Sequence, residues 1–133
     1  MKQTYTGSCH CGAIRYQAEL DLSAGSARCN CRYCSKIRYW GIMAKPAEFK
    51  ILAGEADLQD YTRHEAMHHR FCRHCGANPF GHGNIPEIGG EFVSVNIACL
   101  DGLSAEQLAE IPIKYSDGLN DNWWNPPAIT KHL

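Results

Sequence analysis

Seven of the eight cysteines in this sequence fall into three short clusters whose spacing suits metal binding. The clusters are Cys9 and Cys11 in GSCHCG, Cys29, Cys31 and Cys34 in CNCRYC, and Cys72 and Cys75 in FCRHCG. Zinc prefers four tetrahedral ligands, and two cysteines separated by one or two residues bind one ion where the backbone turns tightly. Gly12 and Gly76 directly follow the two outer pairs and relieve such turns. Each outer pair therefore supplies half of a zinc site.

The two outer pairs together predict one closed zinc site, the four-thiol cluster. Its members are Cys9, Cys11, Cys72 and Cys75. Four thiolates complete the zinc tetrahedron and leave no position for a substrate, which is typical of structural zinc. We expect this ion to tie the first strands to the middle of the chain and to contribute directly to folding.

The middle cluster predicts a second zinc site with a vacant position, the three-thiol cluster of Cys29, Cys31 and Cys34. A zinc ion with three protein ligands keeps one position for water or a substrate. Three thiolates leave the ion with a net negative charge, so it generates hydroxide poorly but can hold another sulfur. We expect a thiol to bind there as thiolate and to attack an electrophilic carbon such as an aldehyde. These three cysteines are therefore the predicted catalytic residues.

A fourth protein ligand at the three-thiol cluster would instead make the second zinc purely structural. Cys99 is one candidate, although a cysteine that ends an apolar strand is more often a small buried hydrophobic residue. His10 and His74 lie inside the paired-cysteine turns and are expected to point outward. The other candidate histidines fall on predicted strands or turns, where an ordinary surface or core histidine is the commoner outcome: His64, His68, His69 and His82.

Basic and aromatic residues surround the three-thiol cluster in the sequence. The basic residues are Arg28, Arg32, Lys36 and Arg38. They either anchor the carboxylates of an acidic thiol such as a glutathione-like tripeptide or form a solvated face. The aromatic candidates for a pocket wall are Tyr33, Tyr39, Trp40, Phe80, Trp123 and Trp124, of which we expect only one or two to meet a ligand.

Length and composition indicate one globular zinc domain over residues 1–133. The chain has 133 residues, 44% of them hydrophobic and 20% charged, which is the balance of a globular protein. The formal net charge is −1, so we expect no overall attraction to nucleic acid or acidic membranes. No apolar run reaches the roughly 20 residues that a membrane span needs.

The cysteine content also bears on the compartment. The segment before Gly12 contains no apolar run typical of a secretory signal, so a cytoplasmic location is expected. In a reducing compartment eight cysteines indicate metal or redox chemistry. The alternative is a disulfide framework in a secreted domain, which the cluster spacing disfavours.

Hydrophobic alternation predicts a mostly β architecture. Ile14, Tyr16, Ala18 and Leu20 occupy one face of a run whose other positions are polar. Further strands are predicted over residues 38–44, 48–52, 58–63, 67–72 and 91–98. One helix is predicted to begin at Ser104 and to end before Pro112, and a second, single-turn helix is predicted after Cys34. The apolar area of such thin sheets is marginal, and metal ions would supply the missing stability.

The motifs GSCHCGAIRY, CNCRYCSK and FCRHCG, in this order, resemble the glutathione-dependent formaldehyde-activating enzyme family, also called the GFA or CENP-V/GFA domain. The resemblance covers about the first four-fifths of the chain. It implies a β-tent fold of packed antiparallel sheets, a structural zinc on the four-thiol cluster and a second zinc on the three-thiol cluster. It also implies adduct formation between glutathione and formaldehyde. After Asp101 the chain matches no family motif, although the segment DGLNDNWW is expected near the pocket mouth.

Three functional hypotheses follow. The first is a zinc-dependent carbon–sulfur lyase that acts on a small-molecule thiol and a small aldehyde. The second is a zinc-stabilised binding module without catalytic activity, because a fold does not fix a function. The third is a redox sensor in which two cysteines of the three-thiol cluster form a disulfide and release zinc.

Overall fold

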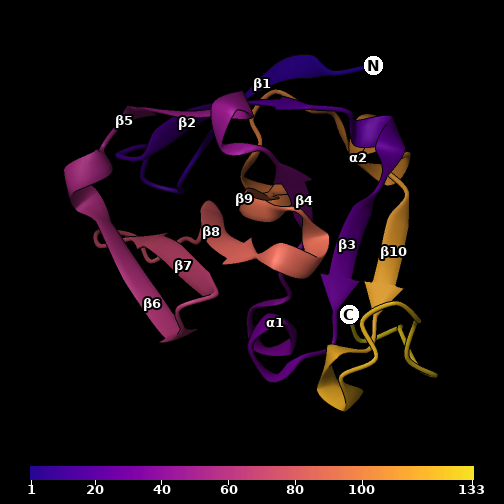
Figure 1. Cartoon of the computed structure of the whole chain (residues 1–133). Helices are drawn as coiled ribbons and strands as arrows, with labels where there is room; N and C mark the ends of the chain where they lie inside the picture. The colour runs from indigo at the N-terminus through magenta and orange to yellow at the C-terminus, as the bar shows by residue number, and fades with distance from the viewer.

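The computed structural model describes residues 1–133 and contains two β-sheets and two short helices. The three-stranded sheet has the order β1-β2-β5, and the seven-stranded sheet has the order β10-β3-β4-β9-β8-β7-β6. The strands are β1 (Gln3–Ser8), β2 (Arg15–Leu20), β3 (Ser26–Cys29), β4 (Gly41–Ala44), β5 (Phe49–Ala53), β6 (Leu58–His64), β7 (Met67–Cys72), β8 (Phe80–Ile85), β9 (Gly90–Asn96) and β10 (Ile113–Ser116). The helices are α1 (Arg32–Ile37) and α2 (Ala105–Ala109). The smaller sheet lies above the larger one in Figure 1. The predicted mostly β class is confirmed.

The core lies between the two sheets. Along β2 the residues Tyr16, Ala18 and Leu20 are buried while Arg15 and Glu19 are exposed, which confirms the predicted alternation. The Tyr16 ring stacks on Phe49 of its own sheet, with 5.3 Å between ring centroids. It also meets Phe80 of the larger sheet edge-on at 6.0 Å. Aromatic packing of this kind joins the two sheets.

The structure contains four strands that the hydrophobic pattern did not predict, namely β1, β3, β8 and β10. β1 is polar and β8 contains two glycines, so neither shows a strand pattern. β3 and β10 have four residues each, and they pair in parallel although they are far apart in the sequence. All the other paired strands are antiparallel, as expected. The strand predicted from residue 38 begins at Gly41 instead, because Arg38 adopts the left-handed conformation that ends α1.

Both helices begin where a side chain caps the amino end. Ser104 caps α2 and forms a capping box with Gln107, which confirms the predicted start. The helix α1 includes Cys34 instead of following it, because the Cys31 sulfur accepts a hydrogen bond from the Cys34 backbone N–H and acts as the cap. No helix of the structure has the length and apolar character that crossing a membrane requires.

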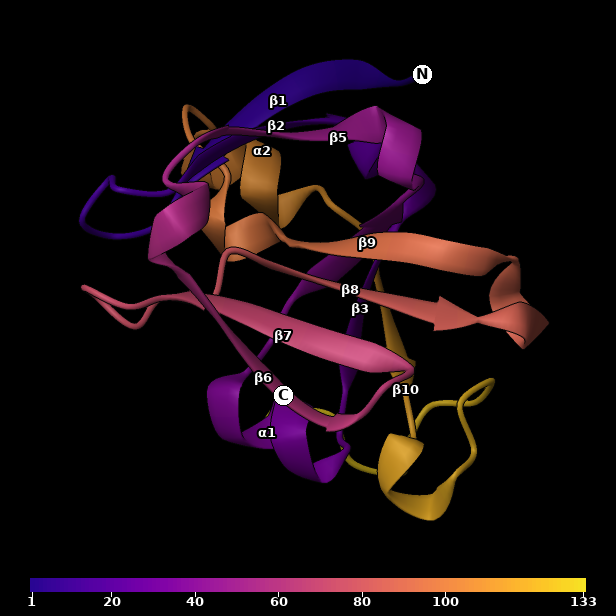
Figure 2. The same cartoon turned by 60° about the vertical axis from the view of Figure 1, so that its left-hand side comes forward.

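The sheets bring the cysteine motifs to two separate places. The loop between β1 and β2 carries Cys9 and Cys11, and the turn after β7 lies opposite it. The end of β3 and the start of α1 carry the three-thiol cluster. Figure 2 shows α1 beneath the β6–β7 hairpin, where the Tyr33 ring of α1 stacks on His69 of β7 with 3.9 Å between centroids.

Candidate metal centres

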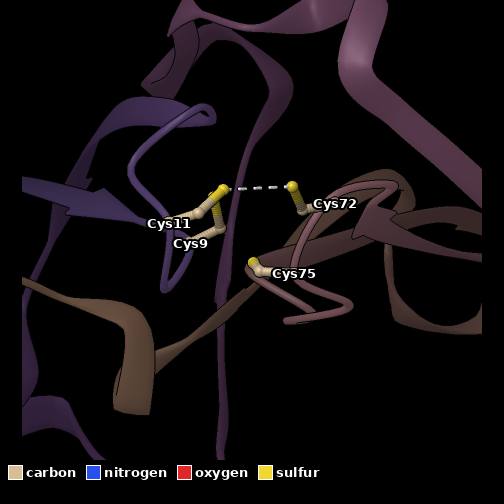
Figure 3. Close-up of side chains that lie close together, drawn as sticks. All are labelled: Cys9, Cys11, Cys72 and Cys75. Atoms are coloured by element: carbon tan, nitrogen blue, oxygen red, sulfur yellow. Dashed lines mark hydrogen bonds between the residues drawn. The ribbon is translucent and has the colours of Figure 1, made fainter.

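The four predicted ligands of the closed site converge in the structure. The sulfur atoms of Cys9, Cys11, Cys72 and Cys75 all lie within 4.8 Å of one another. Those of Cys9 and Cys11 are 3.6 Å apart, and those of Cys11 and Cys72 are 3.7 Å apart. Figure 3 shows the two pairs facing each other from separate turns. Cys9 and Cys72 are almost completely buried, with 3% and 0% of their surface exposed.

These distances test whether the thiols fit a zinc ion. Four sulfurs at 2.3 Å from a tetrahedral zinc lie about 3.8 Å apart, whereas the sulfurs of a disulfide lie about 2.05 Å apart. The observed separations match the first value, and all eight cysteines are free. The donor set of the four-thiol cluster therefore fits structural zinc.

Each of the two turns that carry these thiols contains a glycine in the left-handed conformation. Gly12 and Gly76 have φ angles of +81° and +76°, so both positions use the left-handed conformation that the sequence predicted for them. Gly12 N–H donates to the Cys9 carbonyl, and Gly76 N–H donates to the Cys72 carbonyl. Backbone N–H groups also point at sulfur: Ile14 donates to Cys9 at 3.3 Å and His74 donates to Cys72 at 3.4 Å. Such donors stabilise the thiolate form, which a metal requires.

A carboxylate fixes the second turn from outside. Asp57 Oδ1 accepts hydrogen bonds from Arg73 Nε and His74 Nε2, both at 3.0 Å. The bond from His74, followed by that from Arg73, lowers the pKa of Asp57. His74 therefore points away from the sulfurs, and His10 is exposed, as expected from the sequence.

The three predicted ligands of the second site also converge, on one short segment. The sulfurs of Cys29, Cys31 and Cys34 lie within 4.8 Å of one another, and all three residues are half-buried. Cys31 N–H donates to the Cys29 sulfur at 3.3 Å, and Cys34 N–H donates to the Cys31 sulfur at 3.4 Å. Between the end of β3 and the start of α1, backbone N–H groups thus donate to the sulfur atoms of the same segment.

Charge explains why the three-thiol cluster suits a cation. Hydrogen bonds with Cys29 and Cys34 lower the pKa of Cys31 to about 2, whereas hydrogen bonds with Cys29 and Cys31 raise the pKa of Cys34. Three like charges this close cannot all form without a compensating cation. The thiols and their backbone donors therefore fit a zinc ion, and no histidine or further cysteine joins the cluster.

The C-terminal loop, residues 117–125, packs directly on this cluster. Asn30 Nδ2 donates to Asp117 Oδ1 at 2.8 Å, and Leu119 N–H donates to Asn30 Oδ1 at 3.0 Å. A Cβ atom at Gly118 would lie 2.7 Å from the Cys29 sulfur and 2.5 Å from the Trp123 ring. Only glycine therefore allows the loop to approach so closely. The segment DGLNDNWW therefore lies against Cys29 and Asn30, although it lines no part of the groove beside the cluster.

A groove of about 400 Å³ borders the cluster, and Cys29 and Cys34 are among the residues that line it. Its wall includes Tyr39, whose hydroxyl donates to the Ser94 carbonyl at 2.8 Å. Burial raises the pKa of Tyr39, so its hydroxyl stays protonated at neutral pH. A second crevice, lined by Arg28 and Arg38 as well as by Cys29 and Cys34, leaves no room for a water molecule.

The remaining candidates from the sequence lie elsewhere. Cys99 is half-buried beside the Asn78 carbonyl and belongs to neither cluster. His68 and His82 stack on each other, and His68 pairs with Asp60.

Two of the aromatic candidates lie near the three-thiol cluster: Tyr39 lines the groove, and Trp123 lies near Cys29. The others have different surroundings. Phe80 is in the core, Tyr33 stacks on His69, and Trp124 is exposed.

Sequence reasoning missed the polar residues that hold the C-terminal loop in place. Asn30 lies inside the CNCRYC motif, and its partner Asp117 is 87 residues further along the chain. Asp117 is itself buried and accepts two more hydrogen bonds from Asn120. The density of Asn and Asp between residues 117 and 125 was the only local signal, and it indicates turns without revealing what the turns contact.

Comparison with known proteins identifies the family of the chain. The sequence model of the family described as glutathione-dependent formaldehyde-activating enzyme (GFA) matches residues 4–114, which include all three cysteine clusters. The chain belongs to this family. A structural-genomics crystal structure of a Rhodobacter sphaeroides protein is similar to this GFA-family chain, with 30% sequence identity and a TM-score of 0.68. The similarity covers 82% of this chain and 99% of that chain. The family match ends before the C-terminal loop, so the covering of Cys29 by Gly118 and Trp123 lies outside the matched region.

Proposed function

We propose that this protein is a zinc-dependent carbon–sulfur lyase that joins a small-molecule thiol to a small aldehyde, as glutathione and formaldehyde are joined in the family's namesake reaction. One observation carries the proposal: the three-thiol cluster is half-buried and borders a groove, while the four-thiol cluster is complete. Membership of the GFA family supports the thiol and aldehyde classes. In this proposal Cys29, Cys31 and Cys34 hold the active zinc.

The reaction needs no oxidant or reductant. The sulfur of the thiolate attacks the carbonyl carbon of the aldehyde, and a carbon–sulfur bond forms. The π electrons of the carbonyl move to oxygen, which takes up the proton that the thiol gave up. The product is an S-(1-hydroxyalkyl) thioether, and the reverse reaction breaks the same bond and returns both substrates.

The surroundings of the three-thiol cluster would favour this chemistry. Zinc bound there would supply positive charge that favours the thiolate form of the substrate at neutral pH. Backbone N–H groups of Cys31 and Cys34 orient the protein sulfurs. The C-terminal loop approaches Cys29 closely at Gly118, where a side chain would collide with both the Cys29 sulfur and the Trp123 ring. Tyr39 lines the groove, and its hydroxyl adds no negative charge there because it stays protonated.

The four-thiol cluster has a different part in this proposal. A zinc ion on Cys9, Cys11, Cys72 and Cys75 would stabilise residues 1–133 as one domain, since it joins turns that are more than 60 residues apart. The chain would then bind two zinc ions. Eight free thiols suit a reducing compartment, and we include a cytoplasmic location in the proposal.

Exchange NMR tests the proposed activity. Glutathione and other thiols are mixed with formaldehyde, and the exchange rate between free and adduct signals is measured with the zinc-loaded protein. Wild type and Cys99→Ser should accelerate exchange equally, because Cys99 lies outside both clusters. Cys31→Ser should reduce the acceleration by more than about a hundredfold. Equal rates for Cys31→Ser and wild type would end the catalytic claim.

A further inference from the structure

We infer that the groove beside the three-thiol cluster binds slender, mainly apolar substrates with one carboxylate, and that Lys114 contacts this carboxylate. This inference rests on the proposed function and deepens it by naming the class of thiol or aldehyde. It also separates this chain from an enzyme built around a tripeptide thiol.

The shape of the groove carries the first part of the argument. β3 and β4 pair only at Ala27 and Gly41, so little of their length is hydrogen-bonded together. The groove of about 400 Å³ is lined by residues of both strands and also by Cys29 and Cys34. Its lining is dominated by small and apolar residues: Ala24, Gly25, Ala27, Gly41, Ile42 and Met43. Such a lining favours an aliphatic chain.

The hydroxyl groups of the groove are already paired within the protein. Tyr39 donates to the Ser94 carbonyl at 2.8 Å, and Ser94 Oγ donates back to the Tyr39 oxygen at 3.2 Å. Ser26 Oγ donates to the Pro112 carbonyl at 2.8 Å and accepts from Trp40 Nε1 at 2.7 Å. A tripeptide thiol has two carboxylates, an ammonium group and amides. In this groove it would lose hydration without gaining matching partners.

Lys114 is the one charged residue in the groove lining. It lies on β10 beside Ala27 of β3, and it takes part in none of the ion pairs of the structure. Ala27 precedes Cys29 by two residues on the same strand, which separates their Cα atoms by about 7 Å. A substrate whose carboxylate is about five to eight carbons from its reacting group therefore spans from the three-thiol cluster to Lys114.

Two other cations near the cluster, Arg28 and Arg38, do not offer an equivalent site. The Arg28 guanidinium lies over the Trp40 ring at 5.0 Å and donates to the Arg38 carbonyl. Arg28 and Arg38 border the crevice that has no room for a water molecule. Of the two spaces beside Cys29 and Cys34, only the groove that includes Lys114 has room for a substrate.

Titration with octanoate, followed by NMR of the zinc-loaded full chain, tests the inference. Octanoate carries the proposed chain and carboxylate but neither a thiol nor an aldehyde. We expect shifts of the Ala27 and Met43 methyl signals, and an affinity that rises about threefold for each methylene added from butanoate to octanoate. Lys114→Gln should weaken octanoate two- to fivefold. Ala27→Leu, at an exposed position, should block the groove.

Matched controls address nonspecific effects of charge and volume. Lys50→Gln removes an exposed lysine from the smaller sheet, and Ala47→Leu enlarges an exposed residue outside the groove. Both variants should bind octanoate like wild type. Equal affinity of Lys114→Gln and wild type would overturn the role of Lys114. The absence of shifts at Ala27 and Met43, or binding of S-methylglutathione in the groove as tightly as octanoate, would overturn the proposed substrate class.

The outcomes also separate this inference from the proposed function. Octanoate binding without any accelerated adduct exchange would leave the groove assignment standing and remove the catalytic proposal. Accelerated exchange with glutathione, combined with no octanoate binding, would leave the catalytic proposal standing and remove the groove assignment.

Discussion

The two cysteine clusters use the same chemical group but are built in different ways. The four-thiol cluster joins two turns more than 60 residues apart, and two of its members are almost completely buried. The three-thiol cluster comes from six consecutive residues, and all of its members are half-buried beside a groove. A bond between distant segments restricts the unfolded chain much more than a bond within one turn does. From this difference we expect that the four-thiol cluster, with its ligands far apart along the chain, stabilises the fold more than the three-thiol cluster does.

Removing a ligand from the buried cluster should have the largest effect. Cys72→Ser deletes a completely buried sulfur that joins β7 to the loop before β2. Because binding of a structural zinc ion contributes to folding free energy, we expect the free energy of unfolding to fall by about 5 kcal/mol or more. Urea unfolding followed by circular dichroism measures this change. Cys99→Ser is the matched control and should cost no more than about 1 kcal/mol; equal losses in the two variants would erase the contrast between the clusters.

The order of zinc loss should also differ between the clusters. The three-thiol cluster has fewer ligands and none of them is fully buried, so a chelator should remove its zinc at least about ten times faster than zinc of the four-thiol cluster. A coloured zinc indicator records the two phases, and circular dichroism records the fold. We expect the sheet signal to persist through the first phase and to fall during the second. A single phase that coincides with unfolding would contradict separate roles.

A smaller effect is expected where the C-terminal loop meets the three-thiol cluster. Gly118→Ala places a methyl group within 2.7 Å of the Cys29 sulfur and 2.5 Å of the Trp123 ring, so the loop must move outward. The cost of such overpacking is about 1 to 3 kcal/mol. Tryptophan fluorescence should report a more exposed Trp123, and zinc of the three-thiol cluster should leave faster. Leu119→Ala, at an exposed neighbouring residue, should change neither property; unchanged fluorescence in Gly118→Ala would show that the loop does not cover Cys29.

Local sequence patterns account for the ligands and for part of the fold. The spacing within each cysteine cluster and the glycines after the outer pairs predict turns that are formed by adjacent residues. Alternation along β2 likewise predicts a strand with one buried face, and Ser104 predicts the start of α2. These features depend on neighbours in the chain, so a single sequence is enough to predict them.

Features that depend on distant partners were not predictable in the same way. β3 and β10 are too short to show alternation, and each is fixed by the other across more than 80 residues. β8 contains Gly81 and Gly83, which weaken any strand pattern, but both glycines lie close against the chain of neighbouring β7 or the turn before it. The link between Asn30 and Asp117 has no local signature, although it places the C-terminal loop on the catalytic candidates.

The zinc content of Cys31→Ser tests the central claim that the two clusters are separate metal centres. Elemental analysis of the purified, reduced protein should find two zinc ions per chain in wild type and one in Cys31→Ser, whose circular dichroism should remain that of wild type. Only the four-thiol cluster would then be filled in the variant. A wild-type protein without zinc, or a Cys31→Ser protein that keeps two zinc ions or loses its fold, would contradict the claim.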